Sequence, residues 1–404
     1  MGVLKSAGQL AGLVVMFFLS FGAWVALEPS AYSQRLEGIP IGIPNPPPVA
    51  PRGRGMDPVA EARFEAMRAP LEKLTPVTDA MLRDPSPNDW LMWRRNYNGW
   101  GHSPLSQINR DNVKNLTVAW TWGMSSGFNE FTPLVHDGIL FLWNYGEIIQ
   151  ALDARNGNLL WEYTYELPKD FIRTTFYRTK RALAIGGNKL IFPTADMHIV
   201  ALDVKTGKVL WNVSTDDPAN SRVYNGGPLV INGKVIMGAS GCAPGGAPRA
   251  IGCFVAGHDL ETGKELWRFN TIAQPGEPGG DTWNNLPADK RWGASVWVPP
   301  SYDPELNLLF VGTGSPFPWS SVQRGTYNPV GGGKNGDSLY INSTLAMNPD
   351  TGKLVWYYQH LPNDTFDQDY SFERVIAPIE WQGRQRKVVI TAGKPAVIEV
   401  LDAK

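Results

Sequence analysis

A twelve-residue segment that occurs four times constrains the fold of this chain more than any other feature. The copies read QALDARNGNLLW, VALDVKTGKVLW, AGHDLETGKELW and LAMNPDTGKLVW, and they begin at Gln150, Val200, Ala256 and Leu345. In each copy the central Asp or Asn can bond to the backbone two residues on, and the glycine can supply the positive φ of a tight turn. Apolar residues flank the turn, and a Trp ends each copy with a large surface to bury. Each copy therefore predicts a β-hairpin.

The spacing of the copies predicts a repeating architecture. The turn Asp or Asn stands at positions 153, 203, 259, 348 and, in a fifth copy that begins at Val400, at 402, so the spacings are 50, 56, 89 and 54 residues. Repeats of roughly 40–50 residues are typical of four-stranded β-propeller blades, each stacked on its neighbours. The longest interval predicts an insertion, and inserted loops often bind ligands. A β-sandwich whose turns resemble one another by coincidence is the alternative fold.

The composition supports an all-β fold and gives no indication of nucleic-acid binding. The 404 residues include 37 Lys and Arg against 38 Asp and Glu, so there is no excess of basic charge for a nucleic acid to meet. The 16 Trp, 42 Gly and 33 Pro are typical of a turn-rich protein with aromatic packing between sheets. Length alone would suggest two or three domains, but the repeats favour one propeller.

Residues 1–33 have the pattern of a targeting segment. Lys5 precedes an apolar run over residues 10–27, and Ala31 and Ser33 are small residues before an expected cleavage site after Ser33. The apolar run is also long enough to cross a bilayer as a helix. We expect either a cleaved signal peptide or a retained membrane anchor, and both place the rest of the chain outside the cytoplasm.

The sequence contains two cysteines, Cys242 and Cys253, in the segment GCAPGGAPRAIGC. In an exported protein such a pair predicts a disulfide across the Gly/Pro-rich loop, with free buried thiols as the alternative. No C-x-x-C-H motif occurs, so we expect no covalently attached haem on this chain.

Three segments are expected after the leader. Residues 34–56 are rich in Pro and Gly and predict an extended linker. Residues 57–88 predict a short helical arm, with one helix that ends at Pro70 and a helical turn over residues 78–83. Residues 89–404 predict the propeller.

The first blade is expected around the first copy of the repeat. Leu116 to Trp122 alternates like a strand and ends on the aromatic pair Trp120 and Trp122. The turns HDG at 136–138 and NYG at 144–146 then separate three further strands.

Taken together, these motifs resemble those of the quinoprotein alcohol dehydrogenases. The resemblance rests on the segment from Asp89 to Trp122, NEFTPL at 129–134, the ALDxxTGxxxW repeats, FYRTKRALA and SYDPELNLLFVGTGSPFPW, and it covers nearly everything from Asp89 to Lys404. Members of this family are eight-bladed propellers that hold pyrroloquinoline quinone (PQQ) and a metal ion on their axis. Eight blades of this size need a longer chain, so the resemblance implies an incomplete propeller, with a small complete propeller as the alternative.

The resemblance also implies a set of residues around the quinone. PQQ is a flat quinone with three carboxylates, so its site needs aromatic faces, hydroxyls and cations. The residues at positions that resemble the family's cofactor shell are Glu130, Arg181, Thr194, Ser240, Gly241 and Ser295. Trp297 matches the Trp that stacks on the ring, whereas Thr175 and Phe176 replace two adjacent cysteines, so only Phe176 could stack on the other face. A solvated Arg181 and a packing role for Trp297 are the alternatives.

The implied catalytic residues are Asp367 and Lys394. Asp367, in LPNDTFDQDYSFE, resembles the family's base, and Lys394 stands where the family keeps a Lys or Arg over the quinone oxygen. Asp369 resembles the extra carboxylate of lanthanide-dependent members, and with Asp367 and Ser315 it would hold Ca²⁺ or a lanthanide ion. Two departures weaken this metal site: Ala243 replaces the family's Glu, and Ser315 replaces its Asn. A solvated acidic turn and an exposed turn Lys are the alternatives.

The resulting hypothesis is a periplasmic quinoprotein dehydrogenase that oxidises an alcohol or polyol to a carbonyl compound. Asp367 would take the hydroxyl proton, while Lys394 and the metal ion would stabilise the developing negative oxygen. Electrons would leave to a separate cytochrome c or quinone acceptor. The alternatives are a non-catalytic envelope propeller that binds proteins, and a degenerate quinoprotein that has lost turnover.

Overall fold

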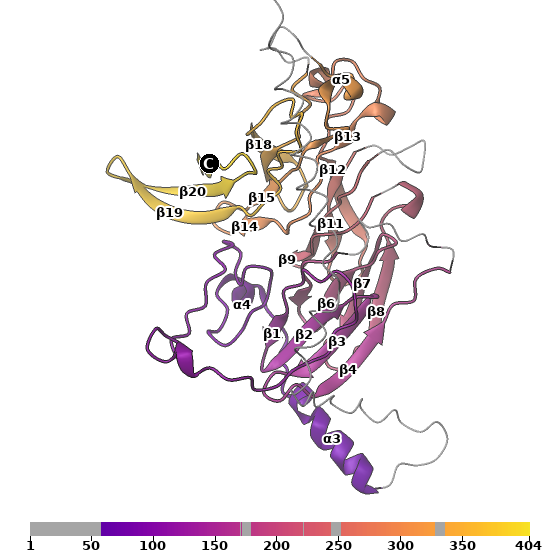
Figure 1. Cartoon of the computed structure of the whole chain (residues 1–404), viewed down its shortest axis with the longest axis vertical. Helices are drawn as coiled ribbons and strands as arrows, with labels where there is room; N and C mark the ends of the chain where they lie inside the picture. The colour runs from indigo at the N-terminus through magenta and orange to yellow at the C-terminus, as the bar shows by residue number, and fades with distance from the viewer. Residues whose placement is uncertain (1–57, 170, 172–178, 221, 244–251, 328–335) are drawn as a thin grey trace, which may run out of the picture. The chain divides into compact units, whose positions relative to one another are not determined.

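The chain folds mainly into antiparallel β-sheets, as its computed structural model shows (Figure 1). The structure describes residues 58–169, 171, 179–220, 222–243, 252–327 and 336–404. These residues fall within one compact unit that spans residues 44–404.

Four sheets of four strands follow one another along the chain, and in each sheet the strands pair in chain order. The first sheet comprises β1 (Leu134–His136), β2 (Ile139–Asn144), β3 (Ile148–Asp153) and β4 (Leu159–Thr164). The second comprises β5 (Ala184–Gly186), β6 (Lys189–Pro193), β7 (His198–Asp203) and β8 (Val209–Ser214). The third comprises β9 (Leu229–Ile231), β10 (Lys234–Gly238), β11 (Phe254–Asp259) and β12 (Glu265–Asn270). The fourth comprises β14 (Ser301–Asp303), β15 (Leu308–Gly312), β17 (Ser343–Met347) and β18 (Leu354–Gln359).

Smaller elements complete the unit. A fifth sheet has three strands, β19 (Val375–Trp381), β20 (Arg384–Ala392) and β21 (Ile398–Asp402). The pair β13 (Trp292–Gly293) and β16 (Pro316–Phe317) lies in the long interval between the third and fourth repeats, where an insertion was expected. The helices are α3 (Pro58–Glu72), α4 (Asp79–Arg83) and α5 (Ser321–Arg324), and the 3₁₀ turns are Val113–Asn115, Pro218–Asn220, Gly280–Trp283 and Ala288–Lys290. The all-β, four-stranded-blade prediction is confirmed.

Each repeat forms the predicted hairpin, because its turn satisfies its own polar groups. In the second copy the carboxylate of Asp203 accepts hydrogen bonds from the backbone N–H and the hydroxyl of Thr206, at 2.9 and 2.8 Å. Gly207 donates its N–H to the carbonyl of Asp203 at 2.8 Å and adopts a φ of +68°, which favours glycine. The strands β7 and β8 that flank this turn pair antiparallel.

The Trp at the end of each hairpin joins one sheet to the next. The indole N–H of Trp161 donates to the carbonyl of Val204 at 2.9 Å, and those of Trp211 and Trp267 donate to Leu260 and Pro349 at 3.1 and 2.9 Å. Each acceptor directly follows the turn Asp or Asn of the next repeat. A side chain on the turn glycine of the next repeat would clash with the Trp ring. The same residues therefore form both the hairpins and the packing between sheets.

The prediction of a strand over Leu116–Trp122 is wrong for this structure. That segment has no strand partner among the described residues, and Leu116 and Val118 are 59% and 77% exposed. A strand requires a neighbour that accepts its backbone hydrogen bonds, which local alternation cannot provide. Trp120 nevertheless donates to the carbonyl of Ala154 at 3.0 Å and packs on Gly157, so it contacts the first sheet as a repeat Trp would.

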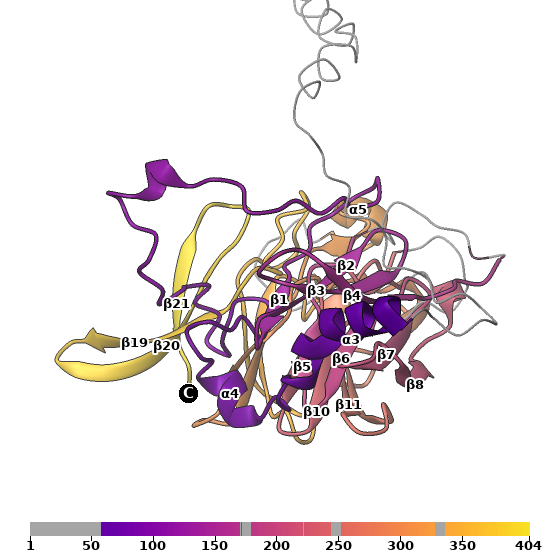
Figure 2. The same ribbon diagram turned by 90° about the horizontal axis from the view of Figure 1, so that it is seen from below.

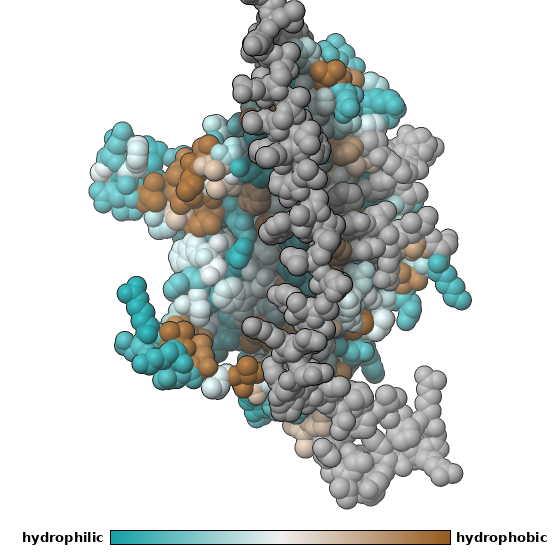
Figure 3. Space-filling model, viewed as in Figure 1, coloured by the Kyte–Doolittle hydropathy of each residue, from teal (hydrophilic) through white to brown (hydrophobic). Residues whose placement is uncertain are grey.

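The fifth sheet leaves apolar side chains exposed. Trp381 of β19 is 57% exposed, and Ile398 and Val400 of β21 are 72% and 52% exposed. Figure 3 shows apolar surface on the β19–β20 hairpin. The indole N–H of Trp356, the repeat Trp of the fourth sheet, is buried and has no hydrogen-bond partner among the described residues.

The helical arm runs along the first two sheets (Figure 2). The prediction that the helix ends at Pro70 is wrong by two residues: α3 continues to Glu72, and the carbonyl of Pro70 accepts the N–H of Lys73 at 3.2 Å in a final turn. Val77 exchanges backbone hydrogen bonds of 2.8 and 2.7 Å with Gly187, and Thr78 caps α4 as expected. No helix among the described residues is long and apolar enough to cross a bilayer.

A buried histidine lies where the arm meets the first sheet. The side chain of His136 is fully buried, with Nε2 2.8 Å from the carbonyl oxygen of Thr75 and Nδ1 3.5 Å from Oδ2 of Asp89. Asp137 lies on the other side, with Oδ2 3.3 Å from Nε2. Burial by itself would lower the pKa of His136, but Asp89, the Thr75 carbonyl and Asp137 outweigh it and hold the pKa above its ordinary value of 6.5.

We expect the free energy of unfolding to fall as pH rises through the raised pKa of His136. The folded protein favours the protonated ring, so this contribution is fully present below a pH of about 6.5 and disappears above the folded-state pKa. Asp89→Asn keeps an acceptor for the N–H of Asp137 but removes a negative charge beside the His136 ring. The free energy of unfolding of this variant should therefore fall less steeply as pH rises. Urea denaturation of both proteins from about pH 6 to pH 9 checks this. If the free energy of unfolding fell equally with pH in both proteins, the pH dependence could not be assigned to the contact between His136 and Asp89.

Candidate active site

A cavity of about 890 Å³ brings together residues from loops of the second and third sheets, from the long insertion and from the loop between β18 and β19. Of the residues predicted from the sequence, its walls contain Arg181, Ser240, Gly241, Ser295, Trp297, Ser315, Asp367 and Asp369. These residues span nearly two hundred positions of the chain, and only the packing of successive sheets places them in one cavity.

A guanidinium and an aromatic ring form one wall of the cavity. The guanidinium carbon of Arg181 lies 5.0 Å from the centre of the Trp297 ring, and Nη1 donates to the carbonyls of Asn225 and Trp297 at 3.3 and 3.4 Å. Glu130 pairs with Arg181, with 2.5 Å between Oε2 and Nη2. Burial lowers the pKa of Arg181, and Glu130 and Glu373 oppose this effect. This arrangement is not that of a solvated surface Arg.

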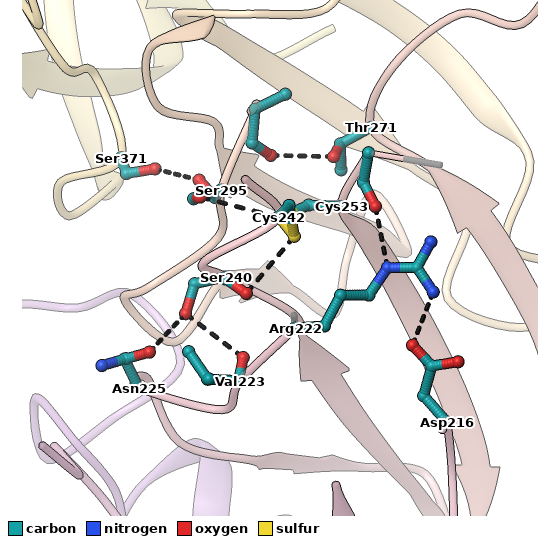
Figure 4. The surroundings of a disulfide bond; sticks show 12 residues. Asp216, Arg222, Val223, Asn225, Ser240, Cys242, Cys253, Thr271, Ser295 and Ser371 are labelled. Atoms are coloured by element: carbon teal, nitrogen blue, oxygen red, sulfur yellow. Dashed lines mark hydrogen bonds and ion pairs between the residues drawn. A yellow bond between two sulfur atoms is a disulfide. The ribbon is translucent and has the colours of Figure 1, made fainter. Parts of the chain in front are cut away.

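A second wall consists of hydroxyls supported by the disulfide (Figure 4). Cys242 and Cys253 are bonded, with 5.4 Å between their Cα atoms, so the disulfide prediction is confirmed and the free-thiol alternative is wrong. The sulfur of Cys253 lies 3.6 Å from Oγ of Ser295, and that of Cys242 lies 3.3 Å from the carbonyl oxygen of Ser240. Oγ of Ser240 donates to Oδ1 of Asn225 at 2.7 Å.

The third wall consists of two carboxylates and one hydroxyl, and the ammonium of Lys394, which is not itself a lining residue, contacts both carboxylates. Nζ of Lys394 lies 2.9 Å from Oδ2 of Asp367 and 2.5 Å from Oδ2 of Asp369. Ser315 donates its hydroxyl to Oδ1 of Asp367 and its backbone N–H to Oδ1 of Asp369, both at 2.8 Å. Lys394 lies in an exposed turn, as the alternative expected, and its ammonium contacts both carboxylates.

The charges in this cluster shift one another's proton affinity. Burial raises the pKa of Asp369, and the neighbouring charge of Asp367 adds to this, while Lys394 and the N–H of Ser315 oppose it. Burial would lower the pKa of Lys394, but its contacts with Asp369 and Asp367 outweigh burial and raise the pKa. Lys394 therefore remains an ammonium at neutral pH.

A buried carboxylate, Asp364, shapes the loop that carries Asp367. Its oxygens accept the backbone N–H groups of Phe366 and Gln368 at 2.8 and 2.7 Å, and the side-chain amide of Asn342 at 2.9 Å. Asp364 and Asp369 are 3% and 8% exposed, so the solvated acidic turn considered above does not describe this loop.

Two of the predicted cofactor residues that the structure describes, Glu130 and Thr194, do not line the cavity. Thr194 is fully buried, and its hydroxyl donates to Oδ1 of Asp196 at 2.5 Å. A short polar side chain in a packed sheet takes the acceptor beside it, which spacing alone cannot reveal. Phe176 lies outside the described residues.

Sequence reasoning missed several residues of the cavity. Asn225 lines it beside Ser240, and the segment from Pro316 to Gln323 forms its remaining side. The motif GTGSPFPW places two aromatic residues, Phe317 and Trp319, within four positions of Ser315. This cluster of aromatic residues is the sequence signal that could have revealed them.

The cluster offers part of a metal-binding shell. Asp367, Asp369 and Ser315 supply carboxylate and hydroxyl oxygens, the ligand types that Ca²⁺ prefers, but Ca²⁺ takes six to eight oxygens. An ion at this place would need further ligands from outside the cluster. A separate group, Asp89, His136 and Asp137, is also close enough to hold an ion, and its geometry is explained by the contacts of His136 described above.

Comparisons with known proteins point to a single family. Residues 90–404 match the family described as "PQQ: Glucose/ethanol/alcohol dehydrogenase, beta-propeller domain". Among curated relatives, the quinohemoprotein alcohol dehydrogenase ADH IIB of Pseudomonas putida is 38% identical over 331 residues, which are 78% of this chain and 46% of the relative. The quinoprotein alcohol dehydrogenase PedH of the same species is 33% identical, over 80% of this chain and 55% of the relative.

Solved structures agree with this match. The quinohemoprotein alcohol dehydrogenase of Comamonas testosteroni superposes with a TM-score of 0.71 and 30% identity, over 84% of this chain and 51% of that one. A europium-containing methanol dehydrogenase superposes with a TM-score of 0.66 and 27% identity, over 79% of this chain and 57% of that one. The chain spans about half the length of these relatives.

Proposed function

Because this chain belongs to the PQQ-type glucose, ethanol and alcohol dehydrogenase β-propeller family, we propose that its cavity binds PQQ and that the protein oxidises an alcohol or polyol to a carbonyl compound. The observation that supports this most is that Arg181, Trp297 and Asp367, which pairs with Lys394, come together at one cavity, which the first three residues line. A scaffold that only binds proteins has no need for that combination.

The cavity walls suit a flat, polyanionic quinone. The guanidinium of Arg181 would bind a cofactor carboxylate, for which its planar geometry is suited, and Glu130 would hold that guanidinium in place. Trp297 would stack on the ring, because Phe372 supports it edge-on with 5.0 Å between ring centres. Gly241 and Ser295 would donate to the remaining oxygens, and Ser240, whose hydroxyl donates to Asn225, would line the site beside them.

The carboxylate cluster would carry out the proton chemistry. The quinone, when bound, supplies a hydride acceptor, and a Ca²⁺ or lanthanide ion held by Asp367, Asp369 and Ser315 would supply Lewis acidity. Asp367 would take the hydroxyl proton, because each of its oxygens keeps a lone pair beyond those used by Ser315 and Lys394. The Lys394 ammonium would stabilise negative charge that develops on oxygen nearby.

We also propose an electron acceptor and a compartment. Electrons would pass to a separate cytochrome c or quinone acceptor. The pattern of residues 1–33 supports a periplasmic protein, either released or anchored through residues 10–27.

Calorimetric titration of the purified protein with PQQ, in the presence of Ca²⁺ or La³⁺, tests the proposal. We expect saturable binding that Arg181→Ala weakens by about 10- to 100-fold, since a hydrogen bond to a charged group contributes about 1.5–3 kcal/mol. Arg384→Ala, which changes an exposed arginine on β20, is the matched control and should leave binding unchanged. The absence of saturable binding by folded wild-type protein would refute the enzyme proposal and favour the scaffold.

A further inference from the structure

We propose that Tyr370 is a positioning residue, which holds the ammonium of Lys394 in place against Asp367 and Asp369. This inference rests on the proposed function, because it explains what fixes the ammonium that would stabilise negative charge on oxygen. Tyr370 does not line the cavity, and it belongs to none of the sets assigned above to the cofactor, the proton or the metal ion.

The turn that carries Lys394 needs support from outside itself. Lys394 lies between β20 and β21, and its side chain is 40% exposed. A long side chain of this kind has many rotamers, so its place depends on where the backbone of the turn is held. The N–H of Lys394 donates to the carbonyl of Asp369 at 3.2 Å. The turn is therefore joined to the loop of the two carboxylates at the residue that precedes Tyr370.

The ring of Tyr370 lies beside this junction. It is 3% exposed, and it packs so closely on Gly393 that an added Cβ there would lie 2.5 Å from the ring. Gly393 directly precedes Lys394, and Tyr370 directly follows Asp369. The ring thus sets the separation between the turn and the loop, because a closer approach would clash and a wider one would open a cavity.

A buried histidine holds the ring of Tyr370 in place. The rings of His360 and Tyr370 are stacked, with 4.4 Å between their centres and 3° between their planes. Nε2 of His360 lies 2.8 Å from Oγ1 of Thr344, and Nδ1 contacts a carboxylate oxygen of Glu399. Because both ring nitrogens have partners, the imidazole has a fixed orientation, and Tyr370 stacks on a fixed surface.

The partners of His360 come from two different sheets. Thr344 belongs to β17 of the fourth sheet, and Glu399 belongs to β21 of the fifth. Oγ1 of Thr344 also accepts a hydrogen bond of 2.8 Å from Nε of Arg374, which is 1% exposed. Burial lowers the pKa of His360 to about 3, and the charge of Arg374 adds to this, so the ring is neutral at neutral pH. The support for Tyr370 is therefore one of packing and hydrogen bonds.

Replacement of Tyr370 by Leu or by Ala tests the inference in the PQQ-loaded protein. Both changes remove the flat ring, so we expect the single-turnover rate with an alcohol to fall by about 10- to 100-fold, as for other groups that are misplaced in a site. Tyr370→Phe keeps the ring and should restore most of the rate. The calorimetric affinity for PQQ should stay within a few-fold of that of the wild type in all three variants, because Tyr370 does not line the cavity.

A double-mutant cycle shows whether Tyr370 acts through Lys394. Lys394→Met alone should lower the single-turnover rate, and the addition of Tyr370→Leu to that variant should cause no further loss. Losses that multiply would overturn the proposal, because Tyr370 would then act independently of the ammonium. A rate that Tyr370→Phe does not restore, or loss of PQQ binding in Tyr370→Leu, would overturn it as well.

Amide hydrogen exchange tests the same contact without PQQ. The N–H of Lys394 should exchange faster in Tyr370→Leu than in the wild type or in Tyr370→Phe, because its bond to Asp369 loses its support. The matched control is Tyr163→Ala, which removes a partly buried ring that packs against Phe192, and it should change neither this exchange nor the rate.

The two kinds of failure are distinguishable. Unchanged exchange of the Lys394 amide in folded Tyr370→Leu would contradict the positioning role by itself. Absence of PQQ binding by the wild-type protein would instead refute the proposed function.

Discussion

Replacing Asp367 with Asn should lower the turnover of the PQQ-loaded protein by about 10²- to 10⁴-fold, the usual contribution of a positioned general base. The amide keeps the size of the side chain and an oxygen toward either Ser315 or Lys394, but it cannot accept a proton at neutral pH. The loss should therefore appear in the chemical step. Single-turnover absorbance of bound quinone upon mixing with an alcohol measures that step directly.

Two controls separate a lost base from a damaged site. The calorimetric affinity of Asp367→Asn for PQQ should remain within a few-fold of that of the wild type, because Arg181 and Trp297 form a separate wall. Asp111→Asn, which changes an exposed carboxylate far from Asp367 in the chain, should leave turnover unchanged. Near-normal turnover in Asp367→Asn would exclude this carboxylate as the base.

Replacing Trp161 with Ala should lower the free energy of unfolding by about 3–5 kcal/mol, the range for removal of a large aromatic side chain from a core. The ring is 7% exposed and packs against Gly207 of the next repeat, and its N–H satisfies the carbonyl of Val204. The variant would lose both contacts and leave a cavity between the first and second sheets. Urea denaturation monitored by far-UV circular dichroism gives the change.

A pair of conservative variants isolates the hydrogen bond. Trp161→Phe keeps most of the ring but leaves the carbonyl of Val204 without its donor, which should cost about 1–3 kcal/mol. Trp356→Phe, at the corresponding position of the fourth sheet, removes an indole N–H that has no partner among the described residues, and should cost less. Equal losses in the two variants would mean that the bond between sheets contributes little.

The repeated hairpins could be predicted from the sequence because their causes lie within twelve residues. An Asp such as Asp203 accepts bonds from residues two and three positions on, and the glycine after it adopts positive φ, so no distant contact is required. The disulfide was predictable for a similar reason, since Cys242 and Cys253 enclose a short loop and residues 1–33 have the pattern of a targeting segment. The strand expected over Leu116–Trp122 failed because pairing needs a partner strand, which local alternation does not supply.

The composition of the candidate site was predicted only through resemblance to a family, residue by residue. Nothing local in the sequence shows that Arg181 lies over Trp297, because these residues are 116 positions apart in the chain. Thr194 illustrates the limit, since its position resembles a cofactor contact while the packed sheet directs its hydroxyl to Asp196.

The sequence by itself determined the turns, the strand periodicity and the chemical types available, because these depend on short-range backbone geometry and on side-chain character. Only the tertiary structure decided which of those side chains meet. It places Lys394 between Asp367 and Asp369, and it joins Pro318 to the loop of Asp364 through Arg324. The physical reason is that such contacts arise from the stacking of sheets through buried Trp rings, and that stacking relates residues far apart in the chain.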